Sequence, residues 1–276
     1  MSDIWEAFAV AYARHDRPAG ENFIGGDPHD APMPLTYYVW VLKNGDRTVV
    51  VDTGFDQRGA ELRGRTITRP VAEGLEALGV DRGGVADVIV THMHYDHIGN
   101  DGLLPNARYH LQDAEMAYAT GRCMCHGPVN HAFEIEDVIH MVRRVYGGRV
   151  RFHDGDAELF PGITLHLVGG HSRGLQCVTV KTRRGPVVLA SDTAHHFAHL
   201  QERKVFPTVD SVPDVLEGYA TLERLGGGLD RIVPGHDPLV SRIYPAFRRE
   251  TEGWIVRLDE APGAIPAREA GRSTER

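Results

Sequence analysis

The motif HMHYDH at residues 92–97 places four potential metal ligands next to one another. It follows an apolar run at residues 86–91, which predicts a buried strand. Alternate residues of an extended segment point the same way, so His92 and His94 can share one metal ion. The chain must then turn for Asp96 and His97 to face a second ion. The motif therefore predicts a metal site built at the end of a strand.

Three more potential ligands lie downstream, and each follows an apolar run. They are His171 after two glycines, Asp192 in the segment ASDT, and His236 in the segment PGHD. Any one of them taken singly is weak evidence, because such residues often cap turns or lie on the surface. Together with the first cluster they make five histidines and two aspartates, enough for two metal ions. The alternative, a surface loop rich in histidine, does not explain the downstream ligands.

The remaining chain alternates between strand and helix patterns. Residues 36–43 and 47–52 are β-rich runs joined by Asn-Gly-Asp, which predicts a hairpin and the first strands of the fold. Further strands are predicted at 86–91, 107–111, 149–153, 163–168, 176–182, 186–191 and 230–233, and helices at 70–79, 194–201 and 212–225. We interpret residues 1–276 as a single domain, with a helical insertion around 112–146 and a polar, frayed tail from about residue 262.

Charge and composition limit the partners. The formal net charge of −8 argues against a nucleic-acid binder, although a local basic pocket for a small anionic substrate is compatible with it. No run approaches the ~20 apolar residues that span a bilayer. The N-terminus lacks the basic region of a signal peptide, and three cysteines make no disulfide framework. We expect a cytoplasmic protein that acts on a small molecule, with no nucleic-acid or membrane partner, and a homodimer as the commonest assembly.

The ligand pattern resembles that of the metallo-β-lactamase superfamily, whose signature H-x-H-x-D-H stands here as HMHYDH, over roughly residues 35–240. The resemblance implies an α/β fold, the αββα sandwich of two mixed sheets flanked by helices. It implies one metal held by His92, His94 and His171, another held by Asp96, His97 and His236, and Asp192 as the bridge between them. The turn Asp52-Thr53-Gly54 matches a family element that supports the site through hydrogen bonds.

Single positions narrow the choice within the superfamily. True β-lactamases of this fold commonly have Cys where Asp192 stands, and flavodiiron oxidoreductases have Glu where His94 stands. The runs YYVWVLKNGDRTVVVDTGF, ASDTAHH and PGHD most resemble the N-acyl homoserine lactone lactonase group. The well-studied lactonases of that group have a tyrosine three residues after the bridging aspartate, where this chain has His195. The resemblance thus indicates a lactonase but leaves the substrate open.

We therefore predict a hydrolase with two divalent metal ions, zinc being the default for these ligands. A hydroxide that bridges the ions, formed when they lower the pKa of water from about 15.7 toward ~7, would attack the ester carbonyl of a small-molecule lactone. Asp96 or His195 would then deliver a proton to the leaving group. The alternatives are a thioester hydrolase of the hydroxyacylglutathione type, another small-molecule ester or amide hydrolase, and a non-enzymatic metal-binding protein. Only 40 residues follow His236, which is short for the helical domain of the thioesterase relatives.

Two smaller motifs allow more than one interpretation. The segment CMCH at residues 123–126, with Cys123 and Cys125, is either a third metal or redox site or a turn whose sulfur-containing side chains fill apolar space. We favour the turn. In the group His195, His196 and His199, we favour one histidine that faces the substrate and two structural ones over another metal site.

Overall fold

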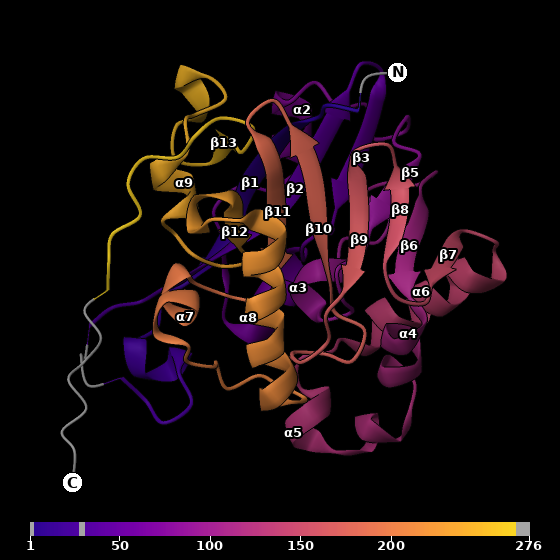
Figure 1. Cartoon of the computed structure of the whole chain (residues 1–276). Coiled ribbons are helices and arrows are strands. Elements are labelled where there is room, and N and C mark those ends of the chain that lie inside the picture. The colour runs from indigo at the N-terminus through magenta and orange to yellow at the C-terminus, as the bar shows by residue number, and fades with distance from the viewer. Residues whose placement is uncertain (1–2, 28–30, 269–276) are drawn as a thin grey trace, which may run out of the picture.

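The computed structural model describes residues 3–27 and 31–268 of the 276-residue chain. Two mixed β-sheets pack face to face, and helices lie outside them, as α8 (Val212–Gly226) does in front of the second sheet (Figure 1). This arrangement confirms the αββα sandwich that the sequence predicted.

The first sheet combines antiparallel and parallel pairing. Its strands in spatial order are β13 (Ile255–Arg257), β1 (Glu6–His15), β2 (Leu35–Asn44), β3 (Arg47–Val51), β5 (Asp87–Ile89), β6 (Arg108–Gln112) and β7 (Val150–His153), and β4 (Thr66–Ile67) pairs with β1. The predicted hairpin is present as β2 and β3, which pair antiparallel. From β3 to β7 the strands run parallel, so the carboxyl ends of β5 and β6 lie at the same edge.

The second sheet consists of β12 (Ile232–Pro234), β11 (Gly185–Ser191), β10 (Gln176–Thr182), β9 (Ile163–Leu167) and β8 (Ala157–Phe160), in that spatial order. Only the β11–β12 pair is parallel. These two strands therefore end at the same edge of the sheet, where each is followed by a predicted metal ligand.

Alternating side chains explain why the first sheet is covered on both faces. In β2, Trp40 and Leu42 point between the sheets, where they meet Leu165, Val178 and other residues of the second sheet. The intervening residues of β1 and β2 point to the opposite face and pack against helices. Because successive side chains of a strand point to opposite faces, a strand buried on both sides is apolar at every position.

The helices cover the outer faces. They are α1 (Gln57–Arg63), α2 (Val71–Ala77), α3 (Tyr95–Ile98), α4 (Asp113–Ala119), α5 (Gly127–Asn130), α6 (Ile135–Tyr146), α7 (Phe197–Glu202), α8 and α9 (Val240–Ile243), with short 3₁₀ turns η1 (Ala19–Asn22), η2 (Arg122–Cys125), η3 (Leu229–Arg231) and η4 (Arg249–Thr251). The segments α4, η2, α5 and α6 occupy the region predicted as a helical insertion, between β6 and β7. No helix among the described residues is long and apolar enough to cross a membrane.

The N-terminal part of the chain differs from the prediction. The first strand is β1 rather than the run at 36–43, and Tyr12 belongs to it. Its first three alanines face the second sheet, its large residues face the helices, and both sets are buried. The segment therefore shows neither the polar alternation of a half-exposed strand nor a clear helical period. The sheet therefore begins about 30 residues earlier than the sequence indicated.

The C-terminal part also differs where it is described. Residues 262–268 were expected to fray, yet Gly263 donates from its backbone to Ile243 at 2.7 Å, and Gln201 donates to the carbonyl of Pro266 at 3.0 Å. Backbone and side-chain bonds therefore attach this segment to α7 and α9. The rest of the predicted tail, 269–276, lies outside the described residues.

Candidate metal centre

The seven predicted ligands come together at one edge of the sandwich, although they span 145 positions of sequence, from 92 to 236. Four of them follow β5, and the others follow β9, β11 and β12. The described residues contain two groups whose ligand atoms all lie within 4.8 Å of one another, and a third that overlaps them. The first group is His92, His94 and His171, and the second is Asp96, His97, Asp192 and His236.

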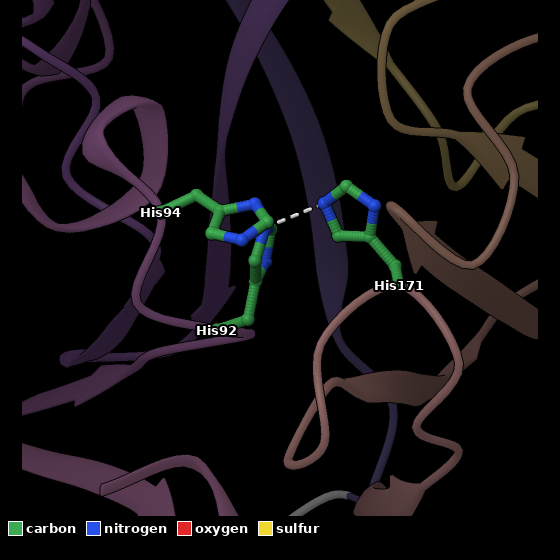
Figure 2. Close-up of side chains that lie close together, drawn as sticks. All are labelled: His92, His94 and His171. Carbon is green, nitrogen blue, oxygen red and sulfur yellow. Dashed lines mark hydrogen bonds between the residues drawn. The ribbon is translucent and has the colours of Figure 1, made fainter. Parts of the chain in front are cut away.

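In the first group, three imidazole rings converge on a common point (Figure 2). The Nε2 atoms of His92 and His171 face each other at 3.2 Å, and all three rings are buried. Burial lowers the pKa of both His92 and His94 well below the usual range, and the neighbouring histidines act in the same direction. Neutral imidazoles that direct lone pairs at one point repel each other unless a cation lies between them, so the group fits a metal ion.

The second group contains buried polar atoms without hydrogen-bond partners. His97 Nε2 and Asp192 Oδ1 are fully buried and make no hydrogen bond within the described parts of the chain. His97 Nε2 lies 3.5 Å from Asp96 Oδ2 and 3.4 Å from Asp192 Oδ1, while His236 Nε2 lies 3.0 Å from the same Asp192 oxygen. Unsatisfied buried polar atoms are costly, and a coordinated cation removes that cost. These residues too fit a metal ion.

Asp192 connects the two groups through its two carboxylate oxygens. Oδ1 lies 3.4 Å from His97 Nε2 and 3.0 Å from His236 Nε2, and Oδ2 lies 3.2 Å from the Nε2 atoms of both His171 and His236. Burial alone would raise the pKa of Asp192, but the surrounding histidines hold it well below the usual range. The preceding residue, Ser191, adopts a positive φ of 46°, a conformation costly for a non-glycine residue that turns the chain at the end of β11. A Cβ on Gly235 would lie 2.7 Å from Asp192 Oδ1, so only glycine permits this approach.

Hydrogen bonds from outside the two groups orient the imidazoles. Asp52 Oδ2 accepts from His97 Nδ1 at 2.7 Å, and the carbonyls of Thr208 and Thr36 accept from the Nδ1 atoms of His171 and His236 at 2.6 and 3.1 Å. Each bond places the proton on Nδ1, so that the unprotonated Nε2 points toward the place where a metal ion would bind. Asp52 also accepts from Thr91, whose hydroxyl receives a bond from Ser191. The aspartate of the Asp52-Thr53-Gly54 turn thus contacts the site as the resemblance implied.

Glu115 in α4 is a further buried carboxylate that the sequence did not single out. Its oxygens accept from the backbone nitrogens of Met93 and Gly174 at 2.7 and 2.9 Å, and from Ser172 Oγ at 2.8 Å. Met93 lies between His92 and His94, and Ser172 follows His171. Glu115 therefore ties together the two loops that carry the first group of ligands. Nothing in the local sequence distinguishes it from an ordinary glutamate in the first turn of a helix.

His195 lies beside Asp192. Its Nε2 is 3.0 Å from Asp192 Oδ2, and its ring stacks on Phe206 with centroids 3.8 Å apart and an interplanar angle of 15°. With His171 and Asp192 it forms the third group of potential ligands. His196 and His199 donate instead to the carbonyls of Pro34 and Asn22, which are structural bonds.

Aromatic rings line the centre. Tyr37 contacts the His236 ring edge-on at 5.0 Å, and Phe133 contacts the His94 ring at 4.7 Å. Phe133 also lines a cavity of about 450 Å³ formed by Arg63 and by residues of the insertion, Met124 among them. Cys123 and Met124 pack against the core, and the CMCH segment belongs to none of the ligand groups found among the described residues. Cys123 and Met124 thus pack as that interpretation expects, whereas Cys125 and His126 are exposed.

Comparison with known proteins agrees with this geometry. The chain matches the metallo-beta-lactamase superfamily over residues 33–236. It is 30% identical to the N-acyl homoserine lactonase AttM of Azorhizobium caulinodans over 63% of this chain and 65% of that protein. It is 28% identical to the AttM lactonase of Rhizobium johnstonii over 82% of this chain and 89% of that protein.

Solved structures show the same fold. A crystal structure of a quorum-quenching N-acyl homoserine lactone lactonase superimposes with a TM-score of 0.70 at 21% identity, covering 84% of this chain and 92% of that one. The hydrolase AbOPH of the β-lactamase superfamily superimposes with a TM-score of 0.71 at 14% identity, covering 96% and 97%. The family match spans most of the chain and includes every predicted ligand. The chain therefore belongs to the metallo-β-lactamase superfamily, as a metal-dependent hydrolase.

Proposed function

We propose that this hydrolase is a dinuclear-metal lactonase that opens the ester ring of a small-molecule lactone. The observation that carries the proposal is the position of Asp192, because its two oxygens face two separate groups of buried ligands. The similarity to proteins named N-acyl homoserine lactonases supports the lactone as substrate class.

In this proposal His92, His94 and His171 hold one ion, Asp96, His97 and His236 hold the other, and Asp192 bridges them. The set of five imidazoles and two carboxylates suits zinc, which we propose for both positions. When bound, two such ions activate water and polarise an ester carbonyl. The protein's own part is to hold the imidazoles in the Nδ1-protonated form, through the bonds to Asp52, Thr36 and Thr208.

Asp96 is the candidate that we favour for moving the proton to the leaving alkoxide. Its carboxylate is one of the more exposed groups of the centre, at 8%, and Oδ2 lies 3.5 Å from both His97 Nε2 and His236 Nε2. His195 is equally exposed, but its Nε2 points at Asp192. That contact supports a positioning role for His195, in which it orients the bridging carboxylate.

Replacing His195 with Phe tests this division of roles. Phenylalanine preserves the stack on Phe206 but removes the bond to Asp192, so we expect kcat/KM to fall by about 10–100-fold, as for other residues that orient metal ligands. A positioning residue affects all substrates alike, so an alkyl lactone and an aryl ester should lose the same factor. His140→Phe, on α6 and outside the ligand groups, serves as the control. A loss confined to the alkyl lactone, whose leaving group needs a proton, would instead identify His195 as the proton donor.

A substrate panel with the zinc-loaded protein tests the proposed reaction. We expect lactones to be hydrolysed with a higher kcat/KM than a glutathione thioester or a β-lactam, and chelation to abolish the activity until zinc is restored. Metal content by elemental analysis accompanies each measurement. Thioester turnover well above lactone turnover would replace the lactonase by the hydroxyacylglutathione-type alternative, and full activity after verified metal removal would refute the metal mechanism.

A further inference from the structure

Two arginines lie beside the candidate metal centre, on a chain whose formal net charge is −8. Arg65 follows α1, and the hydroxyls of Tyr95 and Tyr37 lead from it to the centre. Arg65 Nε donates to Tyr95 Oη at 3.2 Å, and that oxygen lies 3.2 Å from Tyr37 Oη. The Tyr37 ring contacts His236. Arg65 is therefore separated from a proposed metal ligand by only two side chains.

Arg65 is held in position, yet its charge is not neutralised by a neighbour. Besides the bond from Nε, its Nη1 donates to the carbonyl of Arg63 at 2.7 Å. Among residues 3–27 and 31–268, no Asp or Glu oxygen forms an ion pair with Arg65 within 4.0 Å. The side chain is half-buried. A guanidinium fixed along one edge by neutral partners can present its other N–H donors to an anion.

Arg17, which follows β1, supplies a second guanidinium in this region, because β1 pairs with β4 with Arg14 opposite Thr66, and this register brings Arg65 to the end of β1. Its side chain is 17% exposed and forms an ion pair with Glu21, whose Oε2 lies 3.8 Å from Nε. Its Nη2 also donates to the backbone carbonyl of Glu21. Nε is buried and makes no hydrogen bond within the described parts of the chain. Burial lowers the pKa of Arg17, and the charge of Arg65 acts in the same direction, although Glu21 opposes both. Within the described parts of the chain, the carboxylate of Glu21 pairs with Arg17 and none pairs with Arg65, so the cluster keeps an excess of positive charge that an anion could neutralise.

The neighbouring basic groups differ from this pair. Burial lowers the pKa of His15 to about 4, and Arg65 and Arg17 act in the same direction, so this imidazole is neutral. Arg63 lies over the Tyr95 ring at 4.0 Å, and its two terminal nitrogens donate to the carbonyls of His131 and Phe133. Arg63 therefore attaches the insertion to α1. Arg65 and Arg17 are the members of this cluster that can bind a ligand.

We propose that Arg65 and Arg17 form an anion-binding subsite for a carboxylate carried by the substrate, so that the preferred substrate is an acidic lactone. This inference rests on the proposed lactonase function. The planar fork of an arginine matches a carboxylate with two parallel hydrogen bonds, and the half-buried position strengthens the attraction relative to open solvent. A neutral acyl amide would leave the Arg65 guanidinium without an anionic partner among the described residues. The subsite therefore selects lactones that carry a negative charge near the ester that reacts.

The test compares two γ-butyrolactones that differ only in carrying a carboxymethyl group or its uncharged carboxamide. We expect the zinc-loaded protein to prefer the acid. Arg65→Met should lower the ratio of the two kcat/KM values about 10–100-fold, the loss expected when hydrogen bonds to a charged group are removed, and mainly through KM. Arg65→Lys keeps the charge without the fork and should lose less. Arg58→Met is the matched control, because Arg58 is on α1 with a side chain 65% exposed, and it should leave the ratio unchanged.

Direct binding separates failure of the subsite from failure of the lactonase proposal. Calorimetry should show glutarate binding to the zinc-loaded protein and an affinity at least about 10-fold weaker in Arg65→Met. If lactones are hydrolysed but neither the ratio nor the glutarate affinity depends on Arg65, the subsite is refuted and the lactonase stands. If no lactone is hydrolysed but glutarate binding depends on Arg65, the lactonase fails and the anion subsite stands. If Arg65→Met does not fold, Arg17→Met is measured in the same way. The inference is then overturned if neither the kcat/KM ratio nor the glutarate affinity changes.

Discussion

Replacing Asp192 with Asn will reduce kcat/KM by at least about 10²–10³-fold, the loss that follows deletion of a single group acting on the transition state. The reason lies in the geometry of the carboxylate. Oδ1 faces His97 and His236, and Oδ2 faces His171, so one side chain serves both groups of ligands. Asparagine has the same shape but carries no negative charge and offers one oxygen in place of two. We therefore expect the variant to lose metal as well as activity.

The measurement is metal content by elemental analysis together with kcat/KM. The bound metal should fall below two ions per chain, and added zinc should restore it only at a higher concentration. Asp156→Asn is the control, because Asp156 also pairs with a histidine, His166 at 2.8 Å, but has a side chain 60% exposed and directly precedes β8. An Asp192→Asn protein that keeps both ions and full activity would contradict the bridging role.

Replacing Glu115 with Ala will weaken metal binding about 10–100-fold, although Glu115 belongs to none of the ligand groups. Its carboxylate accepts three hydrogen bonds from the loops that carry His92, His94 and His171. Without it, the buried donors of Met93, Ser172 and Gly174 lose their acceptor. We expect the free energy of unfolding to fall by about 3 kcal/mol, since each unsatisfied donor costs about 1–3 kcal/mol and water in the void recovers part of the loss.

Competition with a chelator measures the metal affinity, and denaturant unfolding of the metal-free protein measures the stability. Glu115→Gln retains the shape and one acceptor oxygen and should lose less in both measurements. Glu136→Ala, an exposed position in the first turn of α6, is the control for removing a helical glutamate. At saturating zinc, the Glu115→Ala protein should regain most of its kcat, because the side chain positions the loops and does not touch the ligands' metal-facing atoms. Unchanged metal affinity would show that the two loops hold their shape without this carboxylate.

Some features of the fold were predictable and others were not. The hairpin of β2 and β3 could be predicted from the sequence, because Asn44-Gly45 lies between two β-rich runs and is a local signal for a tight turn. Strand β1 could not be predicted in this way. Its alanines and its large apolar residues are buried on both faces, so polar and apolar residues do not alternate along it. The docking of residues 262–268 escaped prediction for a different reason. The backbone nitrogen of Gly263 donates to the carbonyl of Ile243, and the side chain of Gln201 donates to the carbonyl of Pro266, so both bonds use backbone groups of this segment, which its side-chain polarity does not reveal.

The sequence by itself determined which side chains can bind metal and where each is attached, because imidazoles and carboxylates placed directly after apolar strands are recognisable locally. The resemblance implied how these ligands are grouped, and the tertiary structure brings them together in those groups. Only the tertiary structure decided that His195 points at Asp192 rather than outward. The same holds for the bonds of Glu115 and for the approach of Arg65 to Tyr95. These contacts join segments far apart in the chain, and their distances depend on how the two sheets and their loops pack, which no local pattern records.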